Sequence, residues 1–150
     1  MRWMDERQGR FYSSIYFGWL AAACVAEGRT DVARNHAFKV LQRARRGERL
    51  GEAVVCRCLA WTASQGGNDA AVERWMRRAE ISATRRGSQR EVALNQWMRG
   101  QILIASGRVG VAQPPIDDSI AAFKRMAMTW HAWRARQQLE GGAVEQPVFA

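Results

Sequence analysis

Two histidines and one pair of adjacent carboxylates are the side chains of this sequence that could perform acid–base chemistry. His36 and His131 are far apart and fall in different expected helices, and no serine, histidine and aspartate share a diagnostic spacing. Asp117 and Asp118 are consecutive, so on a helix they point in different directions and form a poor catalytic pair. We therefore expect no catalytic residue, no cofactor and no enzymatic activity in this chain.

Three cysteines, Cys24, Cys56 and Cys58, are the candidates for disulfide or metal chemistry. Their odd number and sparse spacing are unlike a disulfide framework. Cys56 and Cys58 are two residues apart, so on a helix they point to nearly opposite sides, which is the wrong geometry for a shared metal. We expect small, buried, reduced thiols, no metal site and a cytoplasmic location.

Arginines give the chain its strongest chemical bias. The net charge is +9, from 23 basic and 14 acidic side chains, and only Lys39 and Lys124 are lysines. One arginine cluster recurs after about 40 residues, and its members form a candidate ridge: Arg45, Arg46, Arg49, Arg85, Arg86 and Arg90. Such a ridge could bind nucleic acid or another polyanion. Alternatively, these cations stabilise the C-terminal ends of helices, each by roughly 0.3–1 kcal/mol.

Helices are the elements that must position these side chains. The first 113 residues contain no proline, which breaks helix interiors. The length of 150 residues and the 47% hydrophobic content fit one domain with a sizeable core. No apolar run reaches the roughly 18 residues of a membrane span, so we expect no membrane partner.

An apolar stretch near the N-terminus, residues 15–26, resembles a secretory signal. Asp5 and Glu6 interrupt the positive charge that should precede such a signal. The stretch also falls into register with later segments, which a cleaved signal should not do. We therefore interpret it as a structural helix.

Self-similarity is the most informative pattern. Residues 46–67 and 86–107 both begin with Arg-Gly and end in glycine, at an offset of 40 residues. Small residues recur at two registers, first at Ala21, Ala60 and Gly100, and then at Ala33, Val72 and Ala112. Small side chains at matched positions let two helices cross closely, so each unit is predicted to be a helical hairpin.

Turn and capping signals divide the chain into seven expected helices. Gly47 and Gly87 fit left-handed C-caps, Asn68 fits an N-cap, and Ser88 with Glu91 forms a capping box. Pro114 and Pro115 are tolerable in the first turn of the sixth helix. The expected helices cover residues 5–27, 30–46, 48–65, 68–86, 88–106, 109–127 and 129–139. We expect one all-α solenoid domain over residues 1–140 and a disordered tail over residues 141–150.

The chain resembles the tetratricopeptide-repeat (TPR) family. The residues that carry the resemblance are Leu20, Ala21, Gly28 and Ala33, then Leu59, Ala60, Gly67 and Val72, and finally Gly100, Gly107 and Ala112. Units of about 40 residues match long-helix variants of this repeat. They look like the repeats appended to bacterial signalling ATPases of the LuxR-type regulator class and to some nucleotide cyclases. Arg99 departs from the pattern, because leucine stands there in the earlier units.

The resemblance implies a right-handed α-solenoid of three hairpins and a C-terminal helix, with a concave groove that binds a partner. Family geometry places Arg57, Trp61, Trp97 and Gln101 on the groove face. Aromatic and guanidinium groups are frequent binding hot spots. The alternative is that the two tryptophans pack between hairpins as core residues.

We therefore expect a protein–protein interaction or scaffold module in bacterial signalling or transcriptional regulation. Its partner would be a protein, bound through a peptide or helix in the groove. Trp130 and Trp133 in the last helix either cap the solenoid or form an exposed patch that drives homodimerisation. The alternative function is binding of nucleic acid or another polyanion through the arginine ridge.

Overall fold

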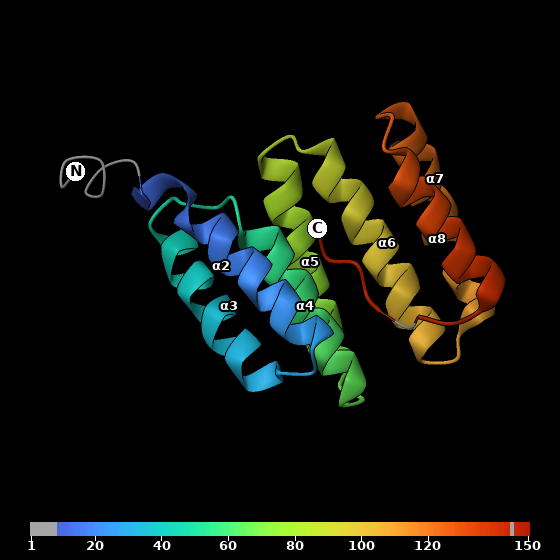
Figure 1. Cartoon of the computed structure of the whole chain (residues 1–150), viewed down its shortest axis with the longest axis horizontal. Helices are drawn as coiled ribbons and strands as arrows, with labels where there is room; N and C mark the ends of the chain where they lie inside the picture. Colours follow the sequence, from blue (N-terminus) through green and yellow to red (C-terminus); the bar gives the residue numbers. More distant parts are fainter. Residues whose placement is uncertain (1–8, 145) are drawn as a thin grey trace.

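The computed structural model describes the backbone of residues 9–144 and 146–150, and the side chains from Ser13 on. This part of the chain contains seven α-helices and no strand (Figure 1). The helices are α2 (Gly9–Ala26), α3 (Thr30–Arg45), α4 (Glu52–Gln65), α5 (Asp69–Arg85), α6 (Gln89–Ala105), α7 (Val109–Arg125) and α8 (Thr129–Gly141). The predicted all-α class is confirmed. Residues 5–8 of the first expected helix lie outside the described residues.

Three hairpins lie side by side and are followed by a terminal helix (Figure 1). Within the hairpins, α2 packs on α3, α4 on α5 and α6 on α7, while α8 packs on α7. The first helices of successive hairpins also touch in order, α2 with α4, α4 with α6, and α6 with α8. One layer of the molecule therefore consists of α2, α4, α6 and α8.

The small residues of the repeat lie where helices cross closely. Ala21 and Ala60 are fully buried, and a Cβ added to Gly100 would collide with the side chain of Ile116 on α7. Ala33 and Ala112, in the second register, are also buried. Val72, the third residue of that register, is only partly buried. The sequence pattern thus identified most of the crossing points, because only small side chains fit between closely packed helices.

Most capping predictions are confirmed. Asn68 accepts a hydrogen bond from the Ala71 N–H at 3.0 Å, and Ser88 accepts one from the Glu91 N–H at 3.3 Å. Gly47 has a φ of 99°, in the left-handed region that glycine tolerates without strain. Glu91 does not complete the capping box, because its carboxylate pairs instead with Arg57 on α4.

The predicted start of α4 at residue 48 is wrong, because the helix begins at Glu52. Residues 48–51 are not helical, and the Glu48 carboxylate accepts a hydrogen bond from the backbone N–H of Ser14 on α2 at 2.6 Å. Gly51 then lies against the Ser14 carbonyl so closely that a Cβ would collide with it. A tertiary contact with α2, rather than local helix propensity, therefore sets the first residue of α4.

The proline pair lies farther inside α7 than expected. With the helix beginning at Val109, Pro114 and Pro115 fall in its second turn rather than its first. Each proline lacks the N–H that would reach back to a carbonyl four residues earlier. Those carbonyls belong to Gly110 and Val111, two exposed residues, so water can hydrogen-bond to them.

Arg99 occupies the α5–α6 interface without disrupting it. Its guanidinium contacts Glu80 at 2.7 Å and Glu73 at 3.0 Å, both on α5. Hydrogen bonds from Arg99, the largest influence, lower the pKa of the Glu73 carboxyl although burial acts in the opposite direction. The third unit thus replaces a leucine contact with an ion-pair network.

Candidate functional site

The four residues expected on the open groove are covered in the structure. Arg57, Trp97 and Gln101 are 0% exposed, and Trp61 is 8% exposed. The cover over Arg57 and Gln101 comes from the chain itself. Residues 146–150, which we name the segment, run from the end of α8 across α6 towards α4 (Figure 1).

The main chain of the segment is held by side chains from three helices. Gln101 on α6 accepts from the Val148 N–H at 2.8 Å and donates to the Val148 carbonyl at 3.2 Å. Arg57 on α4 donates through Nε to the Phe149 carbonyl at 2.8 Å. Gln138 on α8 donates to the Gln146 carbonyl at 3.4 Å. These contacts bind backbone groups and therefore do not depend on the side chains of the segment.

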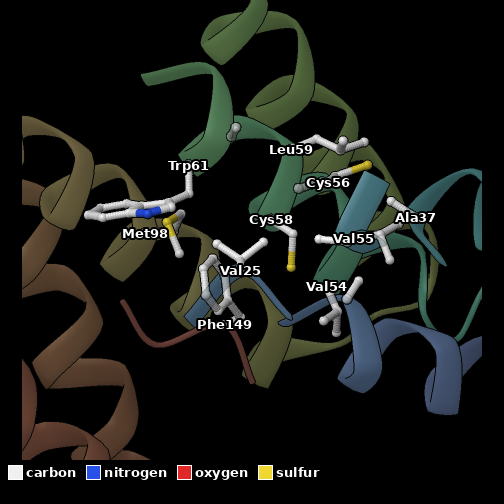
Figure 2. Close-up of a cluster of buried hydrophobic side chains, with 14 of the residues drawn as sticks. Val25, Ala37, Val54, Val55, Cys56, Cys58, Leu59, Trp61, Met98 and Phe149 are labelled. Atoms are coloured by element: carbon white, nitrogen blue, oxygen red, sulfur yellow. The ribbon is translucent and has the colours of Figure 1, made fainter. Parts of the chain in front are cut away.

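Phe149 supplies the apolar contact of the segment. Its side chain is 4% exposed and belongs to the core cluster that includes Val25, Cys58, Trp61 and Met98. Figure 2 shows the Phe149 ring beside Val25, with Met98 and Trp61 nearby. Burying a phenylalanine side chain contributes about 1.5–3 kcal/mol, so this ring is the main apolar anchor.

In the structure, residues 146–150 of the expected disordered tail pack against the helices. The sequence of the tail contains Val144, Val148 and Phe149, and all three pack against the two hydrophobic clusters. The physical reason is that buried polar groups on α4 and α6 need hydrogen-bond partners, which the segment backbone supplies. We name the side chains that hold it the segment site: Arg57, Trp61, Gln101, His131 and Gln138.

Arg57 connects the segment to α6 through a buried polar network. Its Nη1 donates to Asn95 Oδ1 at 2.7 Å, and its Nη2 lies 2.7 Å from Glu91 Oε2. Neither Arg57 nor Asn95 is more than 1% exposed. The Asn95 Nδ2 amide has no hydrogen-bond partner among the described residues, and the contact of Arg57 Nη2 with Glu91 Oε2 is an ion pair without hydrogen-bond geometry. Removing one partner from such a network leaves an uncompensated buried charge.

Trp97 interacts with the segment indirectly, through Gln138. Its ring packs edge-on against Phe123 at 5.5 Å and against His131 at 6.0 Å, which is a core position between α6, α7 and α8. Its indole Nε1–H donates to Gln138 Oε1 at 2.8 Å. The core interpretation therefore fits Trp97, which orients the amide of Gln138 towards Gln146.

His131 is the residue of the segment site that lies beside Ala150, the last residue of the segment. Burial is the largest effect and lowers the pKa of His131 below 6.5; the positive charge of Arg90 also lowers it. A hydrogen bond with the backbone of Ala150 acts in the opposite direction. The neutral imidazole is thus the favoured form beside the segment.

Sequence reasoning found Arg57 and Gln101 but missed Asn95, Gln138 and the segment itself. Gln138 lies in a polar stretch that looks like an exposed helix face, yet it is 3% exposed. A usable signal was the presence of Val148 and Phe149 after an expected domain end, because apolar residues are uncommon in disordered tails.

The arginine ridge is divided between two surface cavities. Arg46 and Arg86 line one of about 1140 Å³, Arg45 and Arg85 line another of about 290 Å³, and Arg49 lines both. Arg90 lies apart and contacts Glu91 at 3.3 Å. The six arginines thus do not form one uniform line of cations.

The cysteines and the acidic residues that the structure describes form no further candidate site. All three cysteines are buried, as predicted, and burial raises the pKa of the Cys56 and Cys58 thiols to about 12. Such thiols stay protonated and are poor nucleophiles. Among the residues that the structure describes, no group of three or more histidine, cysteine, aspartate or glutamate side chains is arranged to hold a metal ion. The same residues include no helix long and apolar enough to cross a bilayer.

Comparison of the chain with protein-family models, with curated proteins and with solved structures found no match. The functional argument therefore depends on the geometry of the chain itself.

Proposed function

We propose that this chain is a protein–protein interaction module that binds an extended peptide of a partner at the segment site. The observation that carries the proposal is the binding of residues 146–150 through their backbone by Arg57, Gln101 and Gln138. Side-chain amides that contact both backbone groups of one residue suit any extended peptide. The resemblance to TPR repeats supports the same function and suggests a scaffold in bacterial signalling or transcriptional regulation, acting in the cytoplasm.

Selectivity would come from the Phe149 pocket. Backbone contacts contribute affinity, whereas a pocket that takes one side chain decides which sequences fit. The pocket wall contains Val25, Trp61 and Met98, so an aromatic or large apolar residue is the best occupant. We therefore propose partners with an exposed extended stretch that carries a phenylalanine-like residue at this position.

The segment would compete with any such partner. A short linker gives an attached peptide an effective concentration in the millimolar range. A partner peptide must therefore either exceed the affinity of residues 146–150 or meet the chain when the segment is displaced. Weakening the Phe149 anchor should expose the site.

The test uses the full chain with Phe149→Ala and a fluorescent peptide that spans residues 144–150. We expect saturable fluorescence anisotropy with the variant and weaker binding to the unchanged chain. A peptide with alanine in place of Phe149 should bind at least about tenfold more weakly, because losing 1.4 kcal/mol costs a factor of ten. The matched control is Phe38→Ala, which removes an exposed phenylalanine of α3 and should leave the segment in place. A folded Phe149→Ala chain that binds no peptide would refute the proposal.

The alternative, nucleic-acid binding along the arginine ridge, has less support. Five of its arginines line two adjacent cavities, and the sixth, Arg90, is paired with Glu91. A nucleic acid backbone needs free cations in a continuous line along its length. Trp130 and Trp133 are 54% and 55% exposed, so self-association of two copies through α8 is a second partner proposal.

A further inference from the structure

We propose that the larger surface cavity of this molecule binds a small ligand that carries adjacent phosphate groups. The cavity, which we name the cationic cleft, has a volume of about 1140 Å³. Its walls come from α2, the C-terminal half of α3, the α3–α4 loop and the end of α5. Five cationic side chains line it: Lys39, Arg43, Arg46, Arg49 and Arg86.

The acidic side chain that lines the cleft does not balance this charge. Glu48 lies 3.2 Å from Arg43 Nη1, and its other oxygen accepts from the Ser14 N–H at 2.6 Å and from Ser13 Oγ at 3.2 Å. Lys39, Arg46 and Arg49 form no ion pair with any acidic residue in the described part of the chain. Three or more cations that face one concavity repel each other, and an anion between them removes that repulsion.

Three of the five cations are held in place before any ligand arrives. Lys39 Nζ and the Arg43 guanidinium lie 5.3 and 5.6 Å from the centroid of the Phe17 ring, within the range of cation–π contacts. Arg86 Nη1 donates to the Leu50 carbonyl at 2.8 Å and to the Arg49 carbonyl at 3.3 Å, which ties the loop to α5. Pre-positioned donors lower the entropic cost of binding an anion.

Phosphate is the group that this chemistry fits best. Guanidinium groups donate two parallel hydrogen bonds to phosphate oxygens, and several such groups in one concavity favour a compact ligand with more than one phosphate. The Phe17 ring already contacts Lys39, Arg43 and a stacked His36 at 5.8 Å, so charge rather than base stacking would govern recognition. Arg45, Arg85 and Arg90 of the ridge are outside the cleft lining, so an extended nucleic acid would use other residues. None of the residues of the segment site takes part, so this inference does not depend on the proposed function.

The experiment is a calorimetric titration of the full chain with inorganic triphosphate at low ionic strength, repeated with a single-stranded oligonucleotide. Two double variants remove the same charge from adjacent surfaces. Lys39→Gln with Arg46→Gln changes the cleft alone, whereas Arg45→Gln with Arg85→Gln changes the smaller cavity alone. All four side chains are exposed, so both variants should fold.

We expect saturable binding of triphosphate that the cleft variant weakens at least about tenfold, because it removes two cationic hydrogen-bond donors to phosphate oxygens. The control variant should change the affinity by less than about twofold to threefold, because only the long-range field is reduced. Absence of saturable binding to the unchanged chain would overturn the proposal. Equal weakening by both variants would also overturn it, because the net charge rather than the cleft would then explain binding. Tighter binding of the oligonucleotide than of triphosphate, weakened by both variants, would assign the basic surface to nucleic acid instead.

Discussion

The segment site and the cationic cleft differ in whether their positive charge is buried and paired or exposed and available. In the segment site, the Arg57 guanidinium is 0% exposed and bonds to Phe149, Asn95 and Glu91. In the cleft, exposed cations such as Arg46 have no acidic partner among the described residues. A buried charge must be paired within the fold, whereas an exposed charge is solvated and remains available to a ligand. The first site should therefore dominate stability, and the exposed cations of the second should affect binding alone.

The largest expected effect comes from Arg57→Met. This change removes the buried cation beside Glu91, whose remaining cation is the half-exposed Arg90, and it leaves the Phe149 carbonyl without its donor. We therefore expect a loss of about 3–5 kcal/mol in the free energy of unfolding. Arg46→Met in the cleft should change stability by no more than about 0.5 kcal/mol. Urea unfolding followed by circular dichroism measures both. Equal effects of the two substitutions would show that burial does not separate the sites.

Gly51→Ala is expected to have a smaller effect than Arg57→Met, comparable to that of Phe149→Ala. Its Cβ would collide with the Ser14 carbonyl, a backbone group that cannot rotate away, so we expect a loss of about 1–3 kcal/mol. The matched control is Gly18→Ala at the same crossing of α2 and α4, where the nearest atoms would lie 3.6 Å from the new Cβ. Thermal unfolding should show a marked decrease for the first variant and little change for the second. An unchanged unfolding temperature for Gly51→Ala would contradict the close contact between Gly51 and the Ser14 carbonyl that precedes α4.

Phe149→Ala should lower stability by about 1.5–3 kcal/mol, because it removes the main apolar anchor of the segment. Phe38→Ala on α3 removes a side chain that is 47% exposed and should cost much less. Limited proteolysis provides a second measurement, since cleavage after residue 142 should accelerate in the first variant alone. Unchanged cleavage would indicate that Phe149 does not hold the segment.

The two sites should also respond to acid at different pH values. His131 beside the segment has a lowered pKa, so the unfolded chain binds its proton first and stability falls as the pH decreases below about 6.5. At the cleft wall, burial raises the pKa of Glu48, but hydrogen bonds from Ser14, Arg43 and Ser13 outweigh it and keep the pKa below 4.5. The stability that Glu48 contributes is therefore complete above that pH and is lost as the pH falls further.

His131→Gln should remove the loss of stability below about pH 6.5, and Glu48→Gln should reduce the loss below about pH 4.5, as followed by thermal unfolding across pH. A single decrease that neither substitution alters would contradict this assignment.

The fold was largely predictable because its signals are local. Small residues such as Ala60 and Gly100 recur at the repeat spacing, and Gly47 adopts the left-handed conformation that its position after α3 required. The start of α4 was not predictable, because it depends on a contact between Glu48 and Ser14, which are 34 residues apart in sequence.

The candidate sites were only partly predictable for the same reason. Arg57 was identified through the family resemblance, but its contact with Phe149 joins residues 92 positions apart. No repeat pattern encodes that pairing, because residues 146–150 belong to no repeat unit. The arginine clusters were visible in sequence, yet their division between two cavities depends on how the α3–α4 loop lies against α5.

The central claim is that an extended peptide occupies the site held by Arg57, Gln101 and Gln138. The most direct test is a nitrogen-15 NMR titration of the Phe149→Ala chain with an unlabelled peptide that spans residues 144–150. The account predicts saturable shifts of the side-chain N–H signals of these three residues and of the Trp61 indole, with no shift at the Gln42 amide in the cleft. Unchanged signals at Arg57 and Gln101, or shifts confined to Gln42, would contradict it.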